Sequence, residues 1–391
     1  MVSMKANVVF VVLTGLLFSF GVFAAAEVNA GLWAQYEAMP INERLAFFKA
    51  QKAESLTDEF LVKALLLADT ESIEKGDDNQ KQVKGELAQW LCRSLGDRKV
   101  ASAAGLLVRI PVQYKDPFLR GEAWIALAKL GDSSLATAMT SELNVLNAGS
   151  RRARPQEVLA AYIIQSLTIL KAKAAFRDVA VASVAWYTPK SGVCELAKNA
   201  LPALSTDPFA ATLVLLGSDD DLIFRENFFN SLGLDKDPVA GGVAADAVLS
   251  TLVTFQLRDS QEKDAAVRLL KASLSAADKS PQPPATLSGP LKALIARKND
   301  IALKLIAVRV LAKIADDPST NVLTTALGDL NQKQKMGSIT KEEVTLVREL
   351  IVNLGVTKKS TAQSVLQEVR FCNYTPAIVN LALESIAKLN S

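Results

Sequence analysis

One helical pattern recurs along this chain of 391 residues. It is clearest at residues 120–132, RGEAWIALAKLGD, where Ala123, Leu127 and Leu130 fall on one face of a helix. Gly131, directly after the last of them, is typical of a helix end. Apolar triplets with the same spacing stand at Ala88, Cys92 and Leu95, at Ala307, Leu311 and Ile314, at Val347, Ile351 and Leu354, and at Ala382, Ile386 and Leu389. A helix that returns in this way is typical of stacked helical repeats.

The repeats return every 34 to 40 residues. The last apolar residues of successive helices are Leu95, Leu130, Leu170, Leu204, Ile314, Leu354 and Leu389. The longer interval between Leu204 and Ile314 leaves room for about three further units. Only a weak trace of the pattern remains there, at Phe229, Leu232, Val267 and Leu270. We therefore expect roughly eight to nine pairs of antiparallel helices.

Four Asp-Pro pairs support this interpretation. They stand at Asp116-Pro117, Asp207-Pro208, Asp237-Pro238 and Asp317-Pro318. An aspartate before a helix accepts hydrogen bonds from the free N–H groups of the first turn, and proline suits the first helical position because no donor is needed there. The pairs therefore predict four helix starts. No run of alternating β-branched residues is long enough for a sheet, so the fold class that we predict is all-α.

Residues 278–290, DKSPQPPATLSGP, form the strongest break in the helical pattern. A helix does not continue through a segment so rich in proline. The break divides the expected repeats into a block at 80–277 and a block at 291–391, preceded by an N-terminal helical cap at 27–79. Three interpretations of the segment stay open: a long surface loop, a hinge between the blocks, and an exposed proline-rich ligand.

The composition excludes several classes of enzyme. The chain has no histidine, which excludes Ser-His-Asp and Cys-His catalysis and zinc sites with imidazole ligands. The cysteines, Cys92, Cys194 and Cys372, form no C-x-x-C motif. Cys92 takes the position of Leu127 in the repeat, so we expect it to be a small buried residue. The formal net charge of +3 is too low to indicate a nucleic-acid partner.

The first 26 residues have the layout of a secretory signal peptide. Lys5 precedes an apolar stretch at 8–23, and small residues at 24–26 suit cleavage, with a second candidate site at 28–30. The alternative is an uncleaved anchor, since residues 8–26 are nearly long enough to span a membrane. We expect cleavage and a mature chain in the periplasm or the extracellular space. The few cysteines favour a bacterial cell envelope.

The repeats resemble those of bacterial HEAT-repeat proteins and the short HEAT-like repeats of phycobilisome lyases. The resemblance is carried by Asp116-Pro117, Arg120, Ala123, Leu127 and Leu130-Gly131-Asp132, and by Ala307, Val308, Arg309, Leu311 and Ile314. It covers residues 80–389 and implies an α-α superhelix of armadillo type that offers one face to protein partners. Other units have Gly85, Cys194, Val344 or Val379 in place of Arg120. A tetratricopeptide array has a similar period, but its repeated Trp, Tyr and Pro positions are not found, so it is the second choice.

Two charge clusters are candidate sites. Arg151, Arg152 and Arg154 could bind an acidic segment, a lipid headgroup or a polyanion, or they could simply be a solvated loop between repeats. The three aspartates at 219–221 could offer oxygen ligands to a hard cation. They lack EF-hand spacing, and a loop before a helix at 222–232 accounts for them better.

These observations predict a non-enzymatic protein–protein interaction scaffold without catalytic residues, metal or cofactor. It would be exported to the cell envelope and bind another protein along the repeat surface, with Arg151, Arg152 and Arg154 as candidate contacts. We expect no nucleic-acid partner and, for the mature chain, no membrane span and at most peripheral contact with the envelope. Two alternatives remain: a lyase-like or chaperone-like accessory factor, which needs a deep pocket with converging polar groups, and binding of an anionic lipid or polymer through the basic loop.

Overall fold

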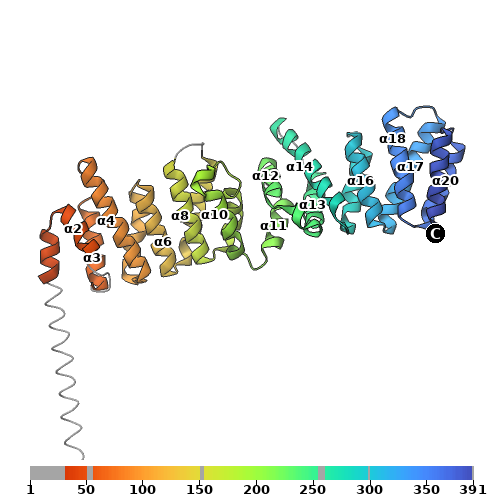
Figure 1. Cartoon of the computed structure of the whole chain (residues 1–391). Helices are drawn as coiled ribbons and strands as arrows, with labels where there is room; N and C mark the ends of the chain where they lie inside the picture. Colours follow the sequence, from red (N-terminus) through yellow and green to blue (C-terminus); the bar gives the residue numbers. More distant parts are fainter. Residues whose placement is uncertain (1–30, 51–55, 150–153, 254–259, 298–299, 390–391) are drawn as a thin grey trace, which may run out of the picture. The chain divides into compact units, whose positions relative to one another are not determined.

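The computed structural model describes residues 31–50, 56–149, 154–253, 260–297 and 300–389. These residues form α-helices joined by short 3-10 turns and loops, and they contain no strand (Figure 1). The all-α prediction is therefore confirmed. No helix among the described residues is both long and apolar enough to cross a bilayer. The predicted signal peptide at 1–26 lies outside the described residues.

The chain forms two compact units, Met1–Ser205 and Thr206–Ser391. The helices of the first unit are α2 (Ile41–Ala50), α3 (Asp58–Thr70), α4 (Asp78–Asp97), α5 (Ala104–Gln113), α6 (Pro117–Leu130), α7 (Ala136–Ala148), α8 (Arg154–Leu170), α9 (Phe176–Ala182) and α10 (Val193–Ala200). The even-numbered helices pack on one another in succession from α2 to α10. Helices α3, α5, α7 and α9 pack against α4, α6, α8 and α10 respectively. The unit is thus a series of helix pairs.

The second unit repeats this plan. Its helices are α11 (Pro208–Leu216), α12 (Leu222–Ser231), α13 (Pro238–Leu252), α14 (Ser260–Lys279), α15 (Ser288–Ala296), α16 (Ile301–Ile314), α17 (Asp317–Lys335), α18 (Lys341–Val356), α19 (Gln363–Glu368) and α20 (Pro376–Leu389). Helices α12, α14, α16, α18 and α20 contact one another in succession, and so do α11, α13, α15, α17 and α19. Sequential packing of this kind is compatible with a helical array in each unit.

Helices α12 and α14 fill the interval in which the repeat pattern is weak. Phe229 in α12 is buried, as its place in the pattern indicates. Val267 in α14 is instead 40% exposed, whereas Ala266 and Leu269 beside it are buried. Helix α14 packs against α12 and α13 and also against α16. Its buried residues, Ala265, Ala266, Leu269, Ser273, Leu274 and Ala277, lie on one face of the helix. Val267 falls just outside that face, so the weak trace in the sequence was out of register there.

The Asp-Pro pairs predict helix starts correctly, with one shift of register. The N-cap residues of α6, α11 and α13 are Asp116, Asp207 and Asp237. In α17 the N-cap is Asp316, whose Oδ1 accepts a hydrogen bond from the Ser319 N–H at 2.7 Å. Asp317 is the first helical residue there, and the following proline still needs no donor.

The proline-rich segment interrupts the helices over a shorter stretch than 278–290. Helix α14 continues to Lys279, and a 3-10 turn at Ala285–Leu287 leads into α15, whose first turn contains Pro290. Only residues 280–284 lie outside helical structure. Buried residues on both sides of the stretch belong to one apolar core: Leu274, Ala277, Leu287 and Leu291. The segment thus lies inside the second unit, and the hinge interpretation stays a prediction.

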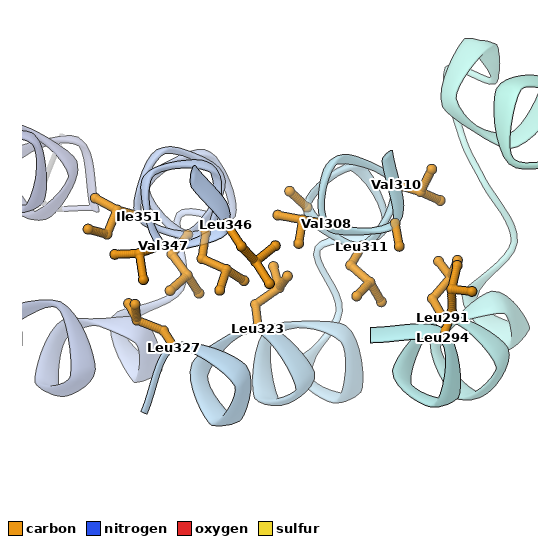
Figure 2. Close-up of a cluster of buried hydrophobic side chains, with 14 of the residues drawn as sticks. Leu291, Leu294, Val308, Val310, Leu311, Leu323, Leu327, Leu346, Val347 and Ile351 are labelled. Carbon is orange, nitrogen blue, oxygen red and sulfur yellow. The ribbon is translucent and has the colours of Figure 1, made fainter. Parts of the chain in front are cut away.

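Most residues of the apolar triplets are buried in the core, and the last of a triplet is often only partly buried, as at Leu130, Ile314 and Leu389. Leu127 in α6 and Leu311 in α16 have no exposed surface. Figure 2 shows how Val308 and Leu311 of α16, Leu323 of α17 and Val347 of α18 meet between the helices. Burial of side chains of this size contributes about 1.5–3 kcal/mol each, so most of the stability of such a unit comes from the contacts between neighbouring helices.

Charged side chains also join successive even-numbered helices. In the first unit Glu122 of α6 is 4% exposed and forms an ion pair with Arg93 of α4. In the second unit Arg309 of α16 bridges two helices, because it lies 3.1 Å from Asp278 of α14 and 3.5 Å from Glu349 of α18. These contacts add polar links to the apolar packing.

Candidate functional site

A groove of about 830 Å³ is hollowed into the second unit, where parts of α15, α16, α17 and α18 meet. Its floor is apolar and consists of Ile295, Ile301, Val322, Ala326, Leu330 and Leu346. Exposed polar residues form its rim: Lys292, Asp300, Thr325, Asp329, Gln332, Lys333 and Glu342. The groove therefore combines an apolar base with an edge that lies in water.

Two helices begin at this groove, and the capping residues fix where they start. Asp300 is the N-cap of α16, and its Oδ1 accepts a hydrogen bond from the Ala302 N–H at 3.0 Å. Thr340 is the N-cap of α18 and forms a capping box with Glu343. In that box the Thr340 Oγ1 accepts from the Glu343 N–H at 3.2 Å, and the Thr340 N–H donates to Glu343 Oε2 at 2.9 Å. The first turns of α16 and α18 are thereby placed at the groove.

Glu343 is held by two partners. Besides the capping box, its Oε1 lies 2.6 Å from the Lys333 Nζ of α17. The hydrogen bond from Lys333 is the main reason that the pKa of Glu343 is below its usual range, and the Thr340 N–H adds to the effect. A carboxylate stabilised in this way stays ionised at neutral pH, so it is poorly suited to general acid or base work.

Lys304 is the unusual charge of the groove. It lies in the first turn of α16, is half-buried, and its ammonium forms no hydrogen bond or ion pair with the described residues. Burial lowers the pKa of Lys304; the carboxylate of Glu343 opposes this shift, and the ammonium of Lys333 adds to it. Lys304 is thus a cation whose loss of hydration is not compensated by a direct partner.

The remaining candidate residues have structural roles. Asp221 is the N-cap of α12, and its Oδ1 accepts from the Ile223 N–H at 2.7 Å and the Phe224 N–H at 3.2 Å. This agrees with a loop at 219–221 before a helix. In the described part of the chain, no three His, Cys, Asp or Glu side chains are grouped so that they could hold a metal ion. Cys92 is fully buried, as predicted, and burial raises the pKa of its thiol.

The structure describes only one arginine of the predicted basic cluster. Arg154 is the first residue of α8 and is exposed. Arg151 and Arg152 lie outside the described residues. A role of this cluster in binding a partner therefore stays a prediction.

The sequence pattern did not point to the groove. Its one local signal is Lys304 within the run IALKLIAV at 301–308, where a charge interrupts an apolar helix. The other parts of the groove come from α15, α17 and α18, and their meeting is a property of the fold.

Comparison with protein-family models and with curated proteins finds no match to this chain. The fold defines an all-helical protein with sequential helix packing. A HEAT-type family remains a resemblance carried by the residues of the repeat.

Proposed function

We propose that this protein is a non-enzymatic scaffold that binds a segment of a partner protein in the groove formed by α15 to α18. The observation that carries the proposal is the groove itself, with its apolar floor and polar rim. Protein interfaces commonly place an apolar centre inside a polar, solvent-accessible edge. A polypeptide segment could therefore bury a few apolar side chains on Val322, Ala326 and Leu330 while its backbone stays close to water.

The sequential helix packing supports this proposal. Arrays of helix pairs bury a continuous core between neighbours and leave long side-chain surfaces for binding. A HEAT-like superhelix of roughly eight to nine pairs, and export to a bacterial envelope by the signal at 1–26, are parts of the same proposal. Both come from the sequence pattern.

The charges of the groove favour binding over a lyase-like activity. Such an activity needs several polar groups that converge on a substrate. Glu343 and Lys333 are instead paired with each other at 2.6 Å, and Asp300 caps α16. Lys304 is left as a cation that suits recognition of charge.

A photo-crosslinking experiment tests the proposal. Benzoylphenylalanine is placed at Thr325 on the rim, and in a control protein at Ala387, an exposed residue of α20 outside the groove. We expect the protein with the probe at Thr325 to capture one dominant partner in intact cells. The purified partner should then bind the wild-type chain and not the Ala326→Trp variant, whose indole would project from the floor into the groove.

Two results would contradict this function. One is the same set of adducts from the probes at Thr325 and Ala387. The other is undiminished binding of the captured partner to the Ala326→Trp variant at an unchanged melting temperature. N-terminal sequencing of the mature protein tests the export separately: a first residue at 27 or 31 fits the signal peptide, and an intact Met1 contradicts it.

A further inference from the structure

We infer that the groove selects a partner segment that carries an Asp or Glu side chain among apolar ones, with the carboxylate bound to Lys304 and the apolar side chains on the floor. This inference rests on the proposed function and names the chemistry of the occupant. It follows from three features of the groove: its charges, its apolar floor and its open rim.

The ammonium of Lys304 has no direct partner among the described residues, although three lysines and four carboxylates line the groove. The groove is lined by Lys292 of α15, Asp300 of α16, Asp329 and Lys333 of α17, and Glu342 and Glu343 of α18. Lys333 and Glu343 neutralise each other at 2.6 Å, and the carboxylate of Asp300 is engaged by the first turn of α16. Neither arrangement gives Lys304 a hydrogen-bonding partner.

The apolar floor makes this lack of a partner important. Ile301 comes three residues before Lys304, and Val322 and Leu346 line the same groove from α17 and α18. A purely apolar occupant would remove water from the ammonium and give nothing in return, which is unfavourable for a charged group. A cationic group placed at Lys304 would add repulsion. A carboxylate at Lys304 would supply a charge-assisted hydrogen bond as the water leaves.

The exposed rim favours a polypeptide over a free fatty acid, although both can offer a carboxylate beside apolar groups. Pockets for small molecules usually enclose most of the ligand surface. Here Thr325, Asp329 and Gln332 line the groove and are exposed. An occupant would therefore remain partly in water, which suits a peptide backbone with its hydrogen-bonding groups.

Peptide selection tests the inference on the full-length chain. Short random peptides are selected on the wild type and on the Ala326→Trp variant, and only those that need an open groove are kept. We expect these peptides to share apolar residues and one Asp or Glu at a fixed position. Fluorescein-labelled copies are then titrated by fluorescence anisotropy.

The role of Lys304 is measured with a double-mutant cycle. Lys304→Gln should weaken binding by at least about tenfold, because it removes a hydrogen bond between charged groups. Replacing the acidic residue of the peptide by its amide should weaken binding to the wild type similarly and to Lys304→Gln much less. Lys341→Gln is the matched control, since Lys341 is an exposed lysine of α18 that does not line the groove.

The possible failures are distinguishable. Groove-dependent peptides without a shared acidic position, or with affinities that Lys304→Gln leaves unchanged, overturn the carboxylate inference while groove binding stands. If no groove-dependent peptides are obtained, or if folded Ala326→Trp and Thr325→Trp variants select the same peptides as the wild type, the proposed function itself is wrong. A fluorescent dodecanoate probe that binds the wild type, displaces the peptides and is excluded by Ala326→Trp would make the occupant a lipid.

Discussion

Replacing Gly96 with alanine tests how closely the even-numbered helices pack. Gly96 lies in the last turn of α4, and a Cβ atom added there would lie 2.6 Å from the Cα of Ala126 in α6 and 2.8 Å from its Cβ. Carbon atoms in favourable contact are about 3.5–4.0 Å apart, so α4 and α6 would have to separate by roughly 1 Å. The obstacle is backbone, which cannot rotate away. Overpacking of this kind costs about 1–3 kcal/mol.

Gly105 provides the matched control. It lies in α5 of the same unit, and an added Cβ would have no neighbour within 4 Å. Exchange of glycine for alanine inside a helix gains about 1 kcal/mol from helix propensity. Both substitutions share that gain, so the difference between their free energies of unfolding isolates the packing cost. We expect Gly96→Ala to be about 1–3 kcal/mol less stable than Gly105→Ala.

Urea unfolding followed by tryptophan fluorescence measures this difference. Trp33, Trp90, Trp124 and Trp186 are the only tryptophans of the chain and all belong to the first unit, so the signal reports on that unit. The second unit offers an independent pair, Gly355→Ala against Gly328→Ala, followed by far-ultraviolet circular dichroism. A Cβ at Gly355 would lie 3.0 Å from the Ser385 Cα, whereas one at Gly328 would have only Val365 at 4.0 Å. Equal stabilities of Gly96→Ala and Gly105→Ala would refute the close approach of α4 and α6.

Three further substitutions test other parts of the structure. Leu127→Asp should destabilise the first unit by about 3 kcal/mol or more, because it buries an unpaired carboxylate in a site with no exposed surface; an unchanged urea midpoint would mean that the repeat register is wrong. Asp316→Ala should cost about 1 kcal/mol of stability through loss of the N-cap of α17, and Asp317→Ala should cost much less, since Asp317 contributes only an exposed ion pair. If thermal melts rank the two variants in the opposite order, Asp317 and not Asp316 is the N-cap. Arg225→Met should raise the stability of the second unit by about 1 kcal/mol or more, because the guanidinium is fully buried, burial lowers its pKa, and its Nε and Nη1 form no hydrogen bond with the described residues. A lower stability by circular dichroism would show that the hydrogen bond from its Nη2 to the Thr251 Oγ1, at 2.7 Å, outweighs the cost of burial.

Features set by a few neighbouring residues could be predicted from the sequence. Gly131 ends α6 in the left-handed conformation, with φ of 85°, as its place after the apolar triplet indicates. The aspartates before prolines cap their helices for the same local reason. The one-residue shift at α17 arises because Asp316 and Asp317 both precede Pro318, and either could cap a helix. Local chemistry therefore predicts that a helix starts there, but it does not decide which of the two aspartates is the N-cap.

Features that depend on several helices could not be predicted in this way. Helix α14 packs against α12, α13 and α16, and Val267 lies just outside the face that these contacts bury, so the spacing alone misplaced the register there. The groove depends on α15, α17 and α18 as much as on α16. In the sequence Lys304 is only a lysine among apolar residues. Lys304 is notable because its ammonium has no hydrogen bond or ion pair with the described residues, and only the arrangement of the four helices reveals this.

The ion pairs between helices show why units with the same apolar repeat pattern can differ in the charged residues on their surfaces. Arg120 of α6 pairs with Glu142 of α7, an odd-numbered helix of the next pair, whereas Arg309 connects α16 to Asp278 of the preceding even-numbered helix. In the first unit Glu122, an acid, links α6 to Arg93 of α4 and also accepts a hydrogen bond from the Tyr162 hydroxyl of α8. Apolar spacing is fixed by helix geometry, because only some positions face the neighbouring helix. Long charged side chains reach past one turn, so different positions can make equivalent links. The apolar pattern of a repeat therefore predicts how its helices stack, and the partner that the array binds depends on residues, such as Lys304, that the pattern does not fix.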